Sequence, residues 1–139
     1  MIFLKILHEM DIPLSQTIEK IINIPIDFRV LQTKSWNTLL EDSGYFENYF
    51  KIKIDDLANA LKQSPALIPS WLQWSEDQRS TPSWSFSKGE SGKYYVGHMP
   101  EDKKIEQLST NDEYYACAVF INNLIQSTRE YLINGTRYS

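Results

Sequence analysis

Nucleophilic or metal chemistry in this chain would have to involve very few residues, because His8 and His98 are its only histidines and Cys117 is its only cysteine. A cysteine activated by a neighbouring histidine forms a nucleophilic pair, and His98 could serve Cys117 in that way. Cys117 stands between Ala116 and Ala118 on the apolar stripe of a predicted helix, where a cysteine is usually buried and inert. No paired spacing of ligands typical of zinc sites is present. We therefore predict no catalytic, cofactor-binding or metal site, and keep an enzyme that uses Cys117 or His98 as an alternative.

The segment 89–93, Gly-Glu-Ser-Gly-Lys, has some features of a phosphate-binding loop. The nucleotide motif requires a glycine where Ser87 stands and a serine or threonine where Tyr94 stands. Two required positions are therefore wrong, and the segment is better interpreted as the turn of a β-hairpin.

Neighbouring carboxylates occur several times along the chain, and paired carboxylates can perform acid–base catalysis when their environments differ. Asp55–Asp56 and Asp112–Glu113 stand at predicted helix N-termini, where the helix dipole favours negative charge. Glu76 and Asp77 instead follow two tryptophans near a predicted helix C-terminus, where the helix dipole disfavours negative charge. Carboxylates kept at an unfavourable position suggest a functional role. We predict a partner-steering acidic set made of Glu76, Asp77, Glu90, Glu101 and Asp102.

Aromatic residues are concentrated between residues 70 and 100, among charges of both signs. Trp84 and Phe86 alternate with serines, which is typical of a strand with one apolar face, and the segment 94–98 predicts its hairpin partner. Too few basic residues lie nearby for a base-stacking surface, so packing in a core is the favoured role. Trp74 and Tyr95 are the aromatic residues that we expect to anchor a protein partner.

The remaining pattern predicts an α+β fold: a small antiparallel sheet, including a central hairpin, packed against several helices, one of them long and C-terminal. That last helix, of roughly 22 residues, would begin with a capping box of Thr110 and Glu113 and end at Asn134-Gly135. Four shorter helices are also predicted. The first begins after Pro13 and ends at Pro25, and the second covers 36–42 after Ser35. The third begins at Asp55, and the fourth covers 70–78. Alternating apolar residues predict a strand at 26–33, while 45–54 is ambiguous and 100–109 is predicted as loop or short strand.

Length and charge limit the possible functions further. With 139 residues the chain fits one globular domain, 1–139. The net charge of −4 disfavours a nucleic-acid binder, which needs a basic surface. The first eleven residues make a poor secretory signal and no apolar run has the length of a membrane span, so a cytoplasmic location and no membrane partner are expected.

The segment Trp74–Phe86, WSEDQRSTPSWSF, followed by Gly92–Gly97, GKYYVG, resembles the small bacterial immunity proteins of polymorphic toxin systems, including contact-dependent growth inhibition. Overall length and acidity add to the resemblance, and the two segments cover about a seventh of the chain. Members of this group differ in fold, so the resemblance implies no fold. It implies a stoichiometric inhibitor, or antitoxin, that binds a cognate toxin domain, often a nuclease, and blocks its active site or substrate groove.

Elementary electrostatics agrees with that expectation, because a nuclease needs a basic groove for phosphates and an acidic surface with aromatic anchors could occupy it. The expected partner is thus a basic protein domain. Two alternatives from other classes remain: the small enzyme described above, and an adaptor that binds a protein other than a toxin.

Overall fold

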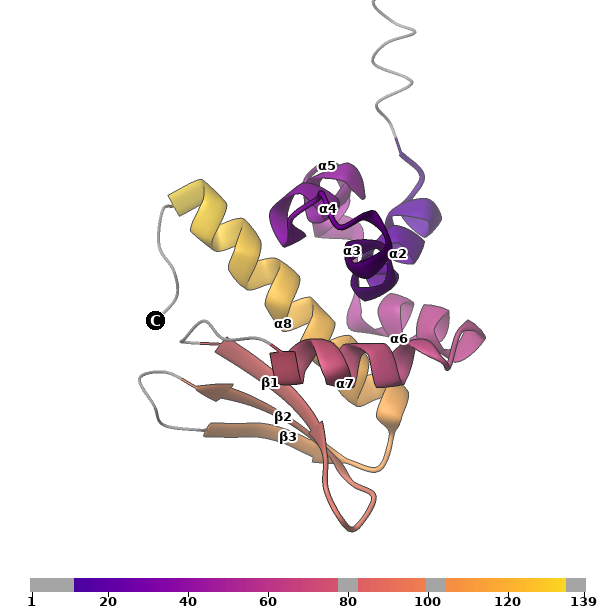
Figure 1. Cartoon of the computed structure of the whole chain (residues 1–139), viewed down its shortest axis with the longest axis vertical. Helices are drawn as coiled ribbons and strands as arrows, with labels where there is room; N and C mark the ends of the chain where they lie inside the picture. The colour runs from indigo at the N-terminus through magenta and orange to yellow at the C-terminus, as the bar shows by residue number, and fades with distance from the viewer. Residues whose placement is uncertain (1–11, 78–82, 100–104, 135–139) are drawn as a thin grey trace, which may run out of the picture. The chain divides into compact units, whose positions relative to one another are not determined.

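The computed structural model describes residues 12–77, 83–99 and 105–134 of the chain, and it has the predicted α+β architecture (Figure 1). Helices precede a three-stranded antiparallel sheet, and a long C-terminal helix follows it. The chain divides into two compact units, with the boundary between Ile52 and Lys53. Two compact units can belong to one domain, so the single domain expected from the length stays a prediction.

The first unit contains short helices: α2 (Leu14–Ile22), α3 (Ile24–Leu31), α4 (Trp36–Asp42), α5 (Tyr45–Asn48) and the 3-10 helix η1 (Tyr49–Lys51). Its buried apolar residues come mainly from α2 and α4. Three buried polar residues tie the helices together. Asn48 donates from Nδ2 to Thr17 Oγ1 over 3.0 Å, and Ser43 donates from Oγ to the carbonyl of Leu40 over 2.6 Å. Satisfying these groups internally removes the cost of burying them.

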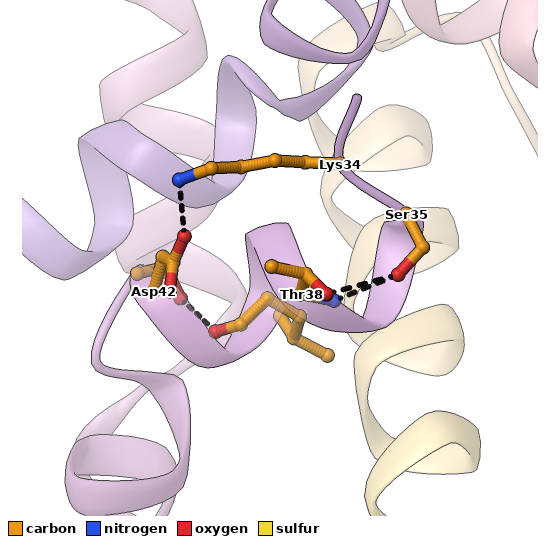
Figure 2. A network of polar contacts seen from close by, with 6 residues as sticks. Lys34, Ser35, Thr38 and Asp42 are labelled. Atoms are coloured by element: carbon orange, nitrogen blue, oxygen red, sulfur yellow. Dashed lines mark hydrogen bonds and ion pairs between the residues drawn. The ribbon is translucent and has the colours of Figure 1, made fainter. Parts of the chain in front are cut away.

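Helix α4 begins where the sequence predicts. Ser35 Oγ accepts a hydrogen bond from the backbone N–H of Thr38 over 3.2 Å, which satisfies one of the free donors of the first turn. An ion pair of 2.8 Å between Lys34 Nζ and Asp42 Oδ2 spans the helix, and Figure 2 shows both contacts. Both members of the ion pair are half exposed, so it adds little stability. The helix ends before Gly44, whose φ of +87° is the left-handed conformation that glycine tolerates best.

The predicted strand at 26–33 is wrong, because these residues belong mostly to helix α3. Pro25 does not end a helix; it stands in the first turn of α3, where its missing N–H costs nothing. Gln32 ends the helix in the left-handed conformation at φ +56°. The alternation of apolar and polar residues instead leaves Phe28 40% and Val30 71% exposed on the helix. The ambiguous segment 45–54 is likewise helical over α5, η1 and the first residue of α6.

The second unit holds helices α6 (Ile54–Gln63), α7 (Leu67–Asp77) and α8 (Glu113–Asn134), with strands β1 (Ser83–Lys88), β2 (Tyr94–Met99) and β3 (Ile105–Thr110). Helix α8 packs against α6, α7 and all three strands, so it forms the scaffold predicted for it. Trp71 of α7 is fully buried and makes an edge-to-face contact of 6.1 Å with Phe120 of α8. Phe86 stacks on the same ring at 5.5 Å.

The predicted hairpin is formed by β1 and β2, and its register places Trp84 opposite His98 and Phe86 opposite Val96. Trp84 donates from Nε1 to Ser127 Oγ of α8 over 2.9 Å, so this side chain faces the helix. The other face of the sheet carries Ser85, Ser87 and Tyr95, which are half-buried, and the exposed Glu106 and Ser109 of β3, which stand opposite Gly97 and Tyr95.

Strand β3 lies at the end of the order β1-β2-β3, where the sequence predicts a loop or a short strand. Its pairing with β2 contains a bulge: Val96 stands opposite Leu108, but Gly97 stands opposite Glu106. A Cβ on Gly97 would lie 3.0 Å from the carbonyl oxygen of Ile105. Glycine is thus required here by the close approach of the bulged strand.

The cap of α8 differs from the predicted pair of Thr110 and Glu113. Asp112 Oδ1 accepts hydrogen bonds from the backbone N–H groups of Tyr114 and Tyr115, each over 3.1 Å. Thr110 supports the turn by accepting from the N–H of Asp112. Aspartate is as good an N-cap as threonine or better, so the sequence contained two competing candidates.

Candidate functional site

The C-terminal end of α7 carries the first group of predicted contact residues. Glu76 and Asp77 are exposed, and Gln73 donates from Nε2 to Asp77 Oδ1 over 3.0 Å. Trp74 is half-buried and packs edge-to-face on Trp71, with 6.2 Å between the ring centroids. The two carboxylates are therefore available to a partner, while much of the Trp74 ring belongs to the core.

The tip of the hairpin carries the second group. Glu90 is exposed in the turn between β1 and β2, and Tyr95 is half-buried at the start of β2. The Tyr95 ring lies against Gly89, since a Cβ added there would be 2.7 Å from Tyr95 Cε2. Tyr95 and Glu90 therefore lie close to each other, because the Tyr95 ring contacts Gly89 and Glu90 follows Gly89 in the chain.

A hollow of about 150 Å³ adjoins Tyr95 on the sheet face that does not carry Trp84 and Phe86. Its rim includes Glu106 of β3, an exposed carboxylate that the sequence did not indicate. The hydroxyl of Ser85, opposite Gly97 on β1, is buried and has no hydrogen-bond partner among the described residues. The lining residues are Ser87, Tyr95, Val96, Gly97 and Glu106.

The two predicted groups do not form one cluster. Ser75, next to Glu76, bonds to the backbone of Phe86, whereas Glu90 lies beyond the other end of β1. At about 3.3 Å per strand residue, roughly 7 Å separates Phe86 from the end of β1 at Lys88, and Glu90 lies beyond that end in the turn. Glu101 and Asp102, the remaining predicted steering residues, lie outside the described residues. Glu76 therefore lies next to a residue that contacts the middle of β1, whereas Glu90 lies in the turn that follows this strand.

Cys117 is completely buried in α8, and burial raises the pKa of its thiol well above the ordinary value. The thiolate that a nucleophile requires is therefore disfavoured. His98 stacks on Trp84 at 4.5 Å, and Trp84 bonds to Ser127. Ser127 lies about 15 Å further along α8 than Cys117, at about 1.5 Å per residue. This geometry does not place His98 where it could activate the thiol.

Tyr94 joins the start of β2 to the start of α8. Its hydroxyl donates to Glu113 Oε2 over 3.0 Å, and its ring is buried against Phe86. Burial first, and then the hydrogen bond and charge of Glu113, raise the pKa of Tyr94. A tyrosine held in its neutral form as a donor to a carboxylate is a structural link, and it fixes the β2 end next to Tyr95.

No family model, curated protein or solved structure matches this chain. Within the described ranges, His, Cys, Asp and Glu side chains nowhere gather in a group of three that could hold a metal ion. None of the helices in the described part of the chain combines the length and the apolar character needed to span a membrane.

Proposed function

We propose that this protein is an immunity protein: a stoichiometric inhibitor that binds a basic toxin domain in the cytoplasm and occludes its active site or substrate groove. The observation that supports this proposal most is the set of exposed carboxylates around the sheet of the second unit. Glu76 and Asp77 stand at the end of α7, which packs along β1, Glu90 stands in the turn after β1, and Glu106 stands on β3. Opposite fields on two proteins speed their encounter, and an acidic surface also competes with phosphates for a basic groove.

The rigidity of that unit also suits an inhibitor. Strands β1 and β2, whose connecting turn carries Glu90, are fixed on α8 by buried aromatic contacts and by the bonds of Trp84 and Tyr94 to the helix. A surface held in place before binding loses little conformational entropy on association. The enzyme alternative gains no support from Cys117, which is buried with a raised pKa.

The test is co-expression with any toxin domain that is encoded beside this gene. We expect this protein to restore growth and to form a one-to-one complex with that domain. Growth arrest that persists despite soluble expression of both proteins would contradict the proposal. An adaptor for some other protein would give the same negative result with the toxin.

The steering role can be measured separately with a charge reversal of Glu76 and Asp77 to lysine. We expect the association rate to fall and its salt dependence to flatten, because steering acts on the encounter and is screened by salt. A matched control reverses Glu41 and Asp55, which are also exposed and accept no side-chain hydrogen bond among those found. Equal slowing by both variants would show that only net charge matters and that the α7 end is not the steering site.

A further inference from the structure

The two edges of the sheet differ in how their backbone groups are satisfied. Helix α7 packs along β1, and the backbone N–H of Phe86 donates to Ser75 Oγ over 2.7 Å. Strand β3 lies at the opposite edge, away from α7 (Figure 1). Among the described residues no further strand or helix pairs with its outer side. An uncovered edge of this kind is a template for another strand.

The register identifies which backbone groups face outward. Because the N–H of Phe86 points to α7, the alternation of an antiparallel ladder turns the backbone of its partner Val96 toward β3. Val96 stands opposite Leu108, so Leu108 faces β2. The next residue, Ser109, then presents its N–H and C=O to the open edge, and its side chain is exposed.

The chemistry beside this edge selects the kind of strand that fits. Glu106 is exposed on β3 and lies at the rim of the hollow next to Tyr95. On an added strand, a lysine or arginine opposite Glu106 would form an attractive cross-strand pair, and the hollow leaves room for its long stem. A second copy of this chain would bring another Glu106 and another net charge of −4 to the same edge, which disfavours self-pairing.

We infer that the outer edge of β3, from Ile105 to Thr110, is a docking site for an extended basic segment of a protein partner, which adds to the sheet as a fourth strand. Main-chain hydrogen bonds at Ser109 would provide affinity, and Glu106 would provide preference for basic side chains. The identification of this partner segment with the toxin rests on the proposed function, but the edge itself can be tested without a toxin.

The probe is an acetylated and amidated heptapeptide of alternating lysine and valine, added to the isotopically labelled full chain at about 1 mM. We expect amide shifts confined to β3 and its neighbours, and at least about tenfold slower hydrogen exchange at Ser109. Two control peptides replace lysine by glutamate or methylate the backbone nitrogens on one edge. We expect the first to bind about two- to fivefold more weakly and the second not to bind.

Shifts centred elsewhere, equal binding of the methylated peptide, or no response to any peptide would each overturn the inference. So would a dimer seen by sedimentation whose contacts protect Ser109, because the occupant would then be a second copy. The variant Ser109→Pro removes the outward N–H without removing the ladder bonds of β3, and it should abolish peptide binding in a folded protein. Retention of binding by folded Ser109→Pro would also contradict the inference.

The toxin domain separates this inference from the proposed function. If the domain binds and protection falls outside β3, the proposed function stands and the edge inference fails. If the peptide protects Ser109 but the toxin domain does not bind, the edge inference stands and the proposed function fails.

Discussion

The edges of the sheet in the second unit are built from similar strands but have opposite surroundings. At β1 a helix packs alongside, and the hydroxyl of Ser75 accepts the outward N–H of Phe86. At β3 most side chains are exposed, and the outward groups of Ser109 face no described element. Within the described residues, the chain covers the β1 edge with its own helix and places no element along the outer side of β3. Whether an edge strand is open to a partner is therefore decided by the element that packs beside it and not by the strand's own residues. Substitutions at the β1 edge and at the β3 edge can test this difference.

The largest effect should come from removing the cover of the β1 edge. Trp71 is fully buried between α7 and α8, so Trp71→Ala should reduce the free energy of unfolding by about 3–5 kcal/mol. Trp84 is only half-buried, so Trp84→Ala should cost less, about 2–3 kcal/mol including its bond to Ser127. Chemical denaturation measures both. A loss at Trp84 that exceeds the loss at Trp71 would show that α7 contributes little to the core.

A pair of proline substitutions one residue apart tests the orientation of β3. Leu108→Pro removes an N–H that faces β2 and should destabilise the protein by about 2–4 kcal/mol. Ser109→Pro removes an outward N–H and should cost no more than about 1 kcal/mol, since proline is tolerated where an edge strand faces solvent. The denaturation midpoints give the order. The reverse order would show that Ser109, not Leu108, pairs with β2.

A pair of serine substitutions compares the two edges directly. Ser75→Ala leaves the part-buried N–H of Phe86 without its acceptor and should cost about 1–2 kcal/mol. Ser109→Ala changes an exposed hydroxyl and should stay within about 0.5 kcal/mol of the wild type. Equal midpoints for the two variants would mean that the contact with Ser75 does not stabilise the β1 edge.

The thiol of Cys117 reports on α8, which holds both edges in place. Because burial raises the pKa of this thiol in the folded state, its contribution to stability is complete below about pH 8.5, the unfolded pKa. That contribution is lost as pH rises toward the folded pKa, by up to about 1.4 kcal/mol per pH unit. Denaturation between pH 8 and 10 should show this decline in the wild type but not in Cys117→Ser. The same decline in both proteins would assign it to other groups.

The sequence was most informative where one periodicity persists over a whole element. The hairpin was predictable because Trp84 and Phe86 alternate with serines and the turn contains glycines. Helix α8 was predictable because its apolar stripe continues for 22 residues. In both, local pattern and tertiary packing agree, so the type and the approximate extent of the elements followed from the residues alone.

In two segments, those of α3 and β3, the pattern of apolar residues is short and is compatible with two kinds of structure. The residues of α3 alternate as in a strand, yet they form a helix that leaves Val30 exposed, so local alternation did not decide the structure. In β3 the bulge places Ile105 opposite His98 and Leu108 opposite Val96, which breaks the spacing of two. For that reason the sequence left loop and short strand open here, of which the short strand is confirmed, and Glu106 was missed as a candidate contact residue. Of the predicted contact residues, exposure of Glu76, Asp77 and Glu90 followed from their charge, but the half-burial of Trp74 depends on α7 packing.

The most direct test of the open edge is hydrogen exchange at two amides, Phe86 and Ser109, in the full chain alone and then bound to the toxin domain that the proposed function requires. In the free protein we expect the Phe86 amide to be protected by its bond to Ser75, and the Ser109 amide to exchange at nearly the rate of an unstructured peptide. In the complex Ser109 should become protected by at least about tenfold, with Phe86 unchanged. Strong protection of Ser109 in the free protein, or no change on binding, would contradict a docking site at β3.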